Sequence, residues 1–403
     1  MAISLLSRAL FTSATLTVGA LALTACTDNS APAAEGKNSP TAITVSSTAD
    51  ACNLSTTSAP SGNLTFSVKN DGSDVTEFYL LAEDGLRIVS EIENIGPGIS
   101  RDLVLTAKPG NYFTSCKPGM VGDGLRAKFT VTDSGANVEP TGEKADQIAS
   151  AVTNYVAYVK DQSESLLTKT EQFTTAYVAG DDDQARSLYA STRVHWERIE
   201  PVAESFGDLD PEMDLREADL EEGQTWTGWH LLEKDLWAPT KEANGGAEYT
   251  PLTQDERKQY ADKLLSDTQK LYDRTHSTDF AESVDASFIG NGAKGLLDEV
   301  ATGKVTGEEE IWSHTDLWDF QANVDGARVA YEGLRDVVLA SDSALAAELD
   351  KQFDAITTQL DQYRDGEGFV EYQTLTEAQV KELAAGVDAL SEPLSKLTAA
   401  VVL

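Results

Sequence analysis

This chain is organised around the segment Gly228-Trp229-His230-Leu231-Leu232-Glu233. His230 and Glu233 are three residues apart, so on a helix their side chains lie on one face, about one turn apart. An imidazole and a carboxylate on the same face make half of a site for iron, manganese or zinc. The segment therefore predicts a helix that carries metal ligands.

A second pair at the same spacing, Glu197 and Glu200, precedes this segment. Two helices that present such pairs to each other would supply the nitrogen and oxygen ligands of one site. His195 lies about 200° from Glu197 on a helical wheel, so it cannot face the same point. We predict that the two carboxylates are ligands and that His195 is a packing residue beside them.

The loop from Phe206 to Gly223 is densely acidic. Most of its carboxylates must face solvent, because burying them all unpaired would cost too much free energy. One or two could still cap the site. Later segments offer further carboxylates at Asp298 and Asp316, although a structural role is the simpler explanation for each.

The chain has 403 residues, which favours two domains, and its charge is strongly negative. There are 67 acidic and 31 basic residues, a formal net charge of −36. Such a surface repels nucleic acid and anionic lipid and concentrates cations. Acidity that serves solubility alone would look the same, so the charge excludes nucleic acid as a partner but does not establish metal binding.

The first 26 residues are predicted to be an export signal, with Arg8 followed by a largely apolar run from Ala9 to Leu23. The run ends in Leu23-Thr24-Ala25-Cys26, which resembles a bacterial lipobox with lipidation at Cys26. Residues 27–41, rich in Ser, Pro and Ala, are predicted to be a disordered tether. These features predict an extracytoplasmic protein anchored by lipid to the outer face of the cell membrane.

Residues 42–135 contain short alternating runs separated by Gly, Pro and Asn, which predicts an all-β sandwich or barrel. Cys116 begins a loop that resembles the ligand loop of cupredoxins, but this region contains no histidine, which excludes an ordinary blue-copper site. The remaining candidates are Cys52, Cys116, Met120 and Glu77. They allow either a structural disulfide or a second metal or redox site.

A linker is predicted at residues 136–143, and residues 144–403 are predicted to be an all-α bundle of about seven or eight helices. Apolar residues recur there at helical spacing. Among the predicted helices are 185–206, 341–364 and 376–403, with Ser or Thr before acidic residues at their starts.

The central segment matches the G-x-H-x-x-E motif of the imelysin, or peptidase M75, superfamily. The segments 193–201, 206–210 and 313–323 are similar to that family as well. A cupredoxin-like domain before an M75 helical domain resembles the periplasmic or lipid-anchored components of Efe-type iron-uptake systems. The resemblance covers nearly the whole mature chain.

The resemblance implies a protein that binds iron and hands it to a membrane iron permease, alongside a secreted haem peroxidase. It places the metal motif on His230 and Glu233, with neighbouring carboxylates at Glu197, Glu200, Asp214 and either Asp298 or Asp316. In the first domain it places metal residues at Cys52, Glu77 and Cys116, for copper or iron. Zinc or manganese would also suit the helical site.

The alternatives are a metal-dependent peptidase and an iron or copper redox protein. Zinc peptidases on helices use H-E-x-x-H, with two histidines as ligands and the glutamate as general base. Here Leu231 stands in the place of that glutamate and there is no second histidine. Peptidase activity is therefore disfavoured, and we expect a binding protein.

Overall fold

A computed structural model describes residues 41–135 and 140–403. The predicted signal, the predicted lipidation site Cys26 and the predicted tether up to residue 40 lie outside the described residues. Thr41, the last residue of the predicted tether, begins the first strand, and Glu143, the last residue of the predicted linker, begins the first helix. Across the described residues, no helix has both the length and the apolar character needed to cross a bilayer.

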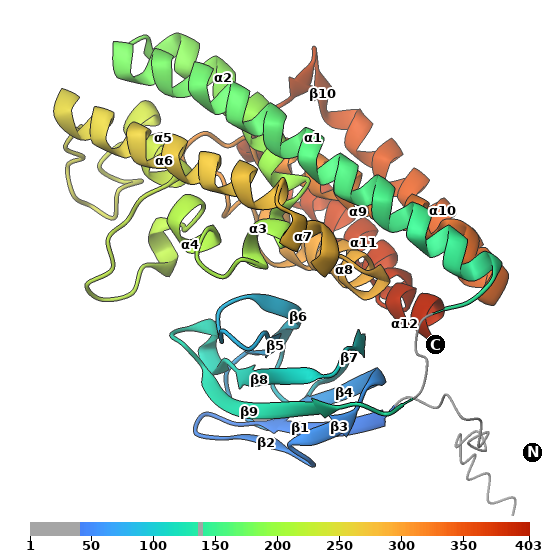
Figure 1. The fold of residues 1–403 in the computed structure, drawn as a ribbon. Coiled ribbons are helices and arrows are strands. Elements are labelled where there is room, and N and C mark those ends of the chain that lie inside the picture. Colours follow the sequence, from blue (N-terminus) through green and yellow to red (C-terminus); the bar gives the residue numbers. More distant parts are fainter. Residues whose placement is uncertain (1–40, 136–139) are drawn as a thin grey trace, which may run out of the picture. The chain divides into compact units, whose positions relative to one another are not determined.

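The N-terminal part consists of two β-sheets (Figure 1). One sheet has the order β2-β1-β4-β7 and the other has the order β3-β9-β8-β5-β6. β1 pairs with β4 and β3 with β9 in parallel, and the other pairs are antiparallel. The strands are β1 (Thr41–Ser47), β2 (Cys52–Leu54), β3 (Ser58–Pro60), β4 (Gly62–Asn70), β5 (Thr76–Leu81), β6 (Ile88–Ile95), β7 (Ser100–Ala107), β8 (Gly110–Cys116) and β9 (Leu125–Thr132).

Alternation along the strands builds the β core. In β4, Leu64, Phe66 and Val68 are fully buried while the residues between them are more accessible, as expected for a strand with one face inside. Phe66 reaches the second sheet, where its ring centroid lies 5.2 Å from that of Phe78 and 5.4 Å from that of Phe129. The predicted two-sheet β fold is confirmed.

The C-terminal part is helical. Figure 1 shows α1 running beside α2, α6 and α9, and these pairs are in contact. The helices are α1 (Glu143–Ala179), α2 (Asp182–Glu197), α3 (Glu200–Glu204), α4 (Asp210–Met213), α5 (Trp229–Trp237), α6 (Gln254–Thr275), α7 (Thr278–Ser283), α8 (Ala286–Thr302), α9 (Asp316–Ser341), α10 (Ser343–Leu360), α11 (Glu377–Leu394) and α12 (Leu397–Val402). Short 3-10 turns join some of them, including η3 (Lys304–Thr306).

The helical fold is confirmed, with two differences in detail. The described residues form twelve α-helices, because several predicted helices are broken into pieces: the predicted helix 185–206 divides between α2 and α3, where Pro201 enters the first turn of α3. A small hairpin, β10 (Arg364–Asp365) with β11 (Gly368–Phe369), interrupts the predicted all-α region. The start predicted at Thr376 is a helix N-cap, because its side chain accepts a hydrogen bond from the backbone N–H of Gln379.

Aromatic packing fixes α5 inside the bundle. Trp229 is fully buried, and its ring centroid lies 5.2 Å from that of Phe173 on α1 and 5.9 Å from that of Tyr189 on α2. Burial of such rings contributes on the order of 2–3 kcal/mol each. The helix that carries His230 is therefore held in the bundle by the aromatic contacts of the preceding residue, Trp229.

Candidate metal centre

Gly228 brings two distant segments together. Its φ of 94° is one that L side chains rarely adopt, and a Cβ there would lie 2.2 Å from the carbonyl oxygen of Met213. Only glycine fits such a close approach. The start of α5 therefore lies directly against the end of α4, which places Asp214 next to His230.

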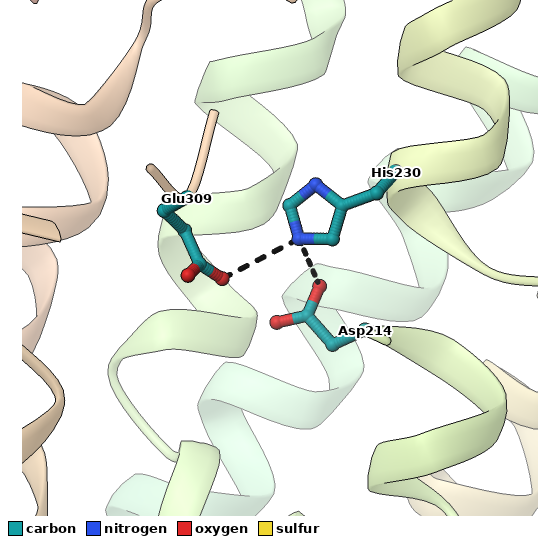
Figure 2. Close-up of side chains that lie close together, drawn as sticks. All are labelled: Asp214, His230 and Glu309. Atoms are coloured by element: carbon teal, nitrogen blue, oxygen red, sulfur yellow. Dashed lines mark ion pairs between the residues drawn. The ribbon is translucent and has the colours of Figure 1, made fainter. Parts of the chain in front are cut away.

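Three side chains from three segments meet at the His230 imidazole (Figure 2). Nε2 of His230 lies 3.5 Å from Oδ1 of Asp214 and 3.4 Å from Oε1 of Glu309. All three residues are more than nine-tenths buried, and Nε2 has no hydrogen-bond partner of good geometry. Ligand atoms bound at about 2.1 Å in a tetrahedral site lie about 3.4 Å apart, so the spacing suits one small cation.

The other ring nitrogen faces the second carboxylate of the motif. Nδ1 of His230 lies 3.2 Å from Oε2 of Glu233, and Glu310 joins these two in a second group whose ligand atoms lie within 4.8 Å of one another. The Oε1 atom of Glu233 accepts hydrogen bonds from the backbone N–H groups of Trp312 (3.0 Å) and Ser313 (2.6 Å). Glu233 therefore orients the imidazole and anchors the loop that carries Glu309 and Glu310.

Negative charge dominates the interior around this point. Arg193 and Lys304 are the fully buried cations that contact its carboxylates in the described part of the chain. The same interior holds eight buried acids: Glu197, Glu200, Asp214, Glu233, Glu309, Glu310, Asp316 and Asp319. Eight carboxylates cannot all stay ionised beside two cations in a low dielectric, so protons or a further cation must neutralise the excess.

Arg193, on α2, is the hub of these ion pairs. Its guanidinium contacts Asp214 directly, lies 2.5 Å from Glu197 and 2.6 Å from Glu310, and lies 3.7 Å from Glu309. A planar fork with five donors is suited to several carboxylates at once. The indole N–H of Trp196 donates to Oδ2 of Asp214 at 2.7 Å, while Oδ1 accepts from Arg193 and also faces His230.

The pKa values report how strongly these groups interact. Burial alone would lower the pKa of His230, but the neighbouring carboxylates of Glu233 and Glu309 outweigh it and hold this pKa well above its usual range. Burial, with the charge of Glu310, raises the pKa of Glu233 to about 7. A proton thus occupies the place of a cation, and a metal ion would have to displace it.

A family model described as Imelysin, Peptidase_M75, matches residues 151–397. The chain belongs to the imelysin family. It is 36% identical over 349 residues to "Iron uptake system component EfeO" of Yersinia pestis, which covers 86% of this chain and 87% of that protein. The protein of that name from Escherichia coli O157:H7 is 36% identical over 358 residues, which is 88% of this chain and 90% of the relative.

A solved structure shares the fold of much of this chain. It is that of a candidate iron-regulated protein A precursor from Parabacteroides distasonis, with a TM-score of 0.51 and 19% sequence identity. The match covers 66% of this chain and 97% of that one. At this identity the likeness concerns the fold alone.

The imelysin motif and its neighbours come together only in part. His230, Glu233 and Asp214 share one site, and Oδ1 of Asp316 accepts the backbone N–H of Glu310 at 3.1 Å beside it. Asp298 instead pairs with Lys294 on its own helix, α8, and belongs to neither group at His230.

The carboxylates predicted from α2 and α3 have other partners. Glu197 and Glu200 contact the ammonium of Lys304, and Glu197 also pairs with Arg193. His195 points elsewhere, with Nδ1 lying 2.8 Å from Oε1 of Gln162.

Several residues of this centre were not predicted from the sequence. Glu309 and Glu310 belong to the run Glu308-Glu309-Glu310, which looks like a solvated acidic loop, yet only Glu308 is exposed. The i,i+4 spacing of Arg193 and Glu197 was an available signal, since such pairs contact each other on a helix. Lys304 and Asp319 had no local signal.

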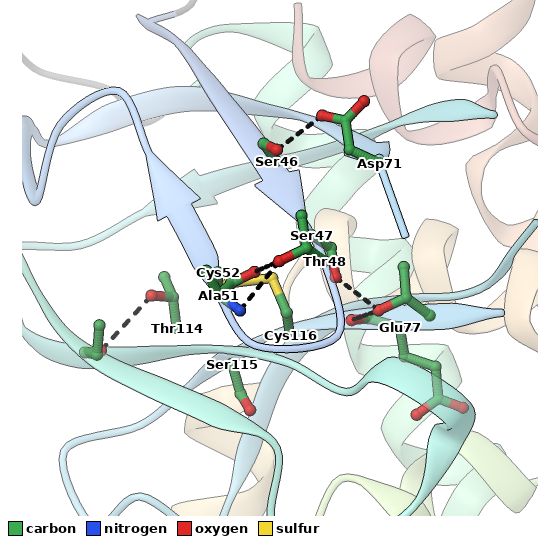
Figure 3. The surroundings of a disulfide bond; sticks show 12 residues. Ser46, Ser47, Thr48, Ala51, Cys52, Asp71, Glu77, Thr114, Ser115 and Cys116 are labelled. Atoms are coloured by element: carbon green, nitrogen blue, oxygen red, sulfur yellow. Dashed lines mark hydrogen bonds between the residues drawn. A yellow bond between two sulfur atoms is a disulfide. The ribbon is translucent and has the colours of Figure 1, made fainter. Parts of the chain in front are cut away.

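The cysteines of the β-sheet region form a disulfide (Figure 3). Cys52 and Cys116 are bridged with a Cα–Cα distance of 5.5 Å, so neither sulfur is a thiolate ligand in this state. In Figure 3 the carboxylate of Glu77 points away from the bridge; it accepts a hydrogen bond from the Tyr79 hydroxyl at 2.5 Å. Met120 is 39% exposed at the end of the 3-10 turn η1 (Pro118–Met120).

Proposed function

We propose that this chain is an extracytoplasmic iron-binding protein that captures iron and delivers it to a membrane permease of an uptake system. One observation carries the proposal: the buried Nε2 atom of His230 lacks a hydrogen-bond partner and faces carboxylate oxygens of Asp214 and Glu309 at 3.5 and 3.4 Å. Relatives that share most of the chain are named as components of iron-uptake systems.

The donor set suits the proposed cargo. Carboxylate oxygens with one imidazole bind ferrous and ferric iron, and manganese and zinc accept the same donors. Glu233 and Glu310 lie on the Nδ1 side of the ring and would help to neutralise the bound ion. We propose that selectivity for iron has two sources, the ligands of the site and the supply of iron by the uptake system.

We also propose a location at the membrane and two partners for this protein. A lipid at Cys26 would hold the protein at the outer face of the membrane, close to an iron permease, with a haem peroxidase as a second partner. Replacement of Cys26 by serine should release the protein from the membrane fraction into the soluble one. Retention of that variant in membranes would contradict lipid anchoring.

Iron titration tests the binding site. We would titrate mature protein with ferrous iron under anaerobic conditions and count bound iron, using wild type, the double variant His230→Ala with Asp214→Asn, and the control His276→Ala. His276 lies at the end of α6, where it stacks on Tyr272. The double variant should lose binding, and unchanged stoichiometry and affinity in it would contradict the proposal.

The family label raises a second candidate, a metal-dependent peptidase. Glu233 is the residue that would have to act as general base, but both its oxygens are engaged, one by two backbone N–H groups and the other by His230. We therefore propose a protein without enzymatic activity. Metal-dependent cleavage of an unfolded protein that disappears in Glu233→Gln would favour the peptidase.

A redox role for the β-sheet region is the other candidate. Copper or iron there would need the Cys52–Cys116 bridge to be reduced first, since thiolates are the ligands. Copper binding that appears only after reduction and fails in Cys116→Ser would support this role.

A further inference from the structure

Lys304 is a fully buried lysine that contacts two of the candidate metal ligands. It begins η3, and its Nζ lies 2.9 Å from Oε2 of Glu197 and 2.8 Å and 3.1 Å from the two oxygens of Glu200. These are charge-assisted hydrogen-bond distances. A buried ammonium is retained at such a place only because carboxylates surround it.

Asn323 on α9 completes this arrangement. Its Nδ2 donates to the carbonyl oxygen of Glu197 at 2.8 Å and approaches Oε2 of Glu197 and of Glu200 at 3.2 and 3.0 Å. The remaining oxygen of Glu197 bonds to Arg193. Every oxygen of this carboxylate pair therefore already has a charged partner.

The His230 site differs because no lysine among the described residues lies between its carboxylates. There the donor atom Nε2 of His230 has no hydrogen-bond partner. The cations near Asp214 and Glu309 are the guanidinium groups of Arg193 and Arg216, and no lysine lies within ion-pair distance of either carboxylate in the described structure. At Glu197 and Glu200 a lysine occupies the space between the carboxylates. A divalent ion placed beside that ammonium would be repelled strongly in a low dielectric.

We propose that Lys304 is a built-in counter-cation that occupies the Glu197 and Glu200 carboxylate pair and so limits the helical region to one metal ion, held at His230. Lys304 is thus a specificity-determining residue. Without its ammonium, the two carboxylates and the amide oxygen of Asn323, which has no hydrogen-bond partner, offer the hard oxygen donors that manganese accepts. The first ion, at His230, rests on the proposed function. The second ion, at Glu197 and Glu200 in a variant without the lysine, is a separate prediction.

Counting bound Mn²⁺ tests the inference. We would measure the free ion by electron paramagnetic resonance during titration of the full mature chain with Mn²⁺ alone, for wild type, Lys304→Met, Lys304→Arg and the double variant Lys304→Met with Glu200→Gln. Wild type and Lys304→Arg should bind one ion, Lys304→Met two, and the double variant one again. A gain of a site that depends on Glu200 is not expected from a lysine with a purely structural role.

The outcomes separate this inference from the proposed function. One ion in folded Lys304→Met would overturn the inference. Wild type could bind no Mn²⁺ while Lys304→Met binds one ion that is lost when Glu200→Gln is added. That result would support the inference and contradict metal binding at His230. If Lys304→Met does not fold, the charge-balanced double variant Lys304→Met with Glu200→Gln tests the inference. An Mn²⁺ affinity within about threefold of the wild-type value supports it. A loss of more than about tenfold, or about 1.4 kcal/mol, would show that Glu200 is a ligand and would overturn it.

Discussion

The indole N–H of Trp196 donates a hydrogen bond to Oδ2 of Asp214 at 2.7 Å, and the other oxygen of the same carboxylate faces His230. Trp196 is fully buried on α2, whereas Asp214 lies just beyond α4. The bond therefore sets the direction of a candidate ligand from outside the site. It also joins the packing of the bundle to the geometry of the metal centre.

Replacing Trp196 by phenylalanine should weaken metal binding while most of the packing remains. The variant leaves Asp214 with one donor fewer and held by Arg193 alone, so we expect affinity to fall about threefold to thirtyfold and stability to fall by about 1–3 kcal/mol. Calorimetric titration and chemical unfolding would measure both. Trp318→Phe, which changes a tryptophan packed on Phe369, should leave the affinity unchanged.

Glu309 and Glu308 form a matched pair of neighbours. Glu309 is buried against His230, and Glu308 is exposed. Glu309→Gln should lower metal affinity by at least about tenfold, which corresponds to about 1.4 kcal/mol, because the variant loses one charged ligand. Glu308→Gln should bind as wild type does, and equal affinities in the two variants would argue against Glu309 as a ligand.

Gly228 should tolerate no side chain. In Gly228→Ala the methyl group meets the Met213 carbonyl, so we expect a loss of more than about 3 kcal/mol, from backbone strain and steric overlap together. Gly246 has a φ of 88° with nothing within 4 Å, so Gly246→Ala measures the strain alone, about 1 kcal/mol. Urea unfolding of the two variants would compare them; similar losses would show that the close approach is unimportant.

Removal of the disulfide should act on stability and not on the helical metal site. The bridge joins residues separated by 64 positions, and loop entropy for that length corresponds to about 4 kcal/mol. We expect Cys52→Ser with Cys116→Ser to lose up to this amount in guanidinium unfolding. Iron bound per chain should stay the same, and a loss of iron would show that the two regions depend on each other.

His195 should make stability depend on pH. Burial, with the charges of Lys169 and Arg198, lowers the pKa of His195 from 6.5 to about 4. The unfolded chain then binds the proton more readily than the folded one, so this contribution to stability is complete above pH 6.5 and is lost as the pH falls toward 4. After allowance for its partial exposure, the loss should be about 1–2 kcal/mol.

Thermal unfolding at pH 7 and pH 4.5 would check this pH dependence. His195→Gln keeps a polar side chain beside Gln162 without a titrating group, so it should lose less stability than wild type between the two pH values. An equal loss in both proteins would assign the acid sensitivity to other groups.

Local sequence patterns were enough to predict much of the secondary structure. Alternation of apolar residues predicted strands such as β4, because a sheet with one face inside needs every second residue buried. The three-residue spacing of His230 and Glu233 predicted that they share a helical face, because that spacing is about one turn. Helix ends were less predictable: the predicted helix 185–206 breaks before Pro201, where tertiary packing starts a new helix.

The sequence by itself determined the two kinds of secondary structure, the glycine before His230 and the pair of ligands on α5, all of which follow from spacing along a single segment. Only the tertiary structure decided that Glu309 completes the site, that Asp298 lies elsewhere and that Lys304 occupies Glu197 and Glu200. The physical reason is that ligands and counter-ions are selected by distance in space. Residues on different segments come within a few ångströms only after the bundle has packed.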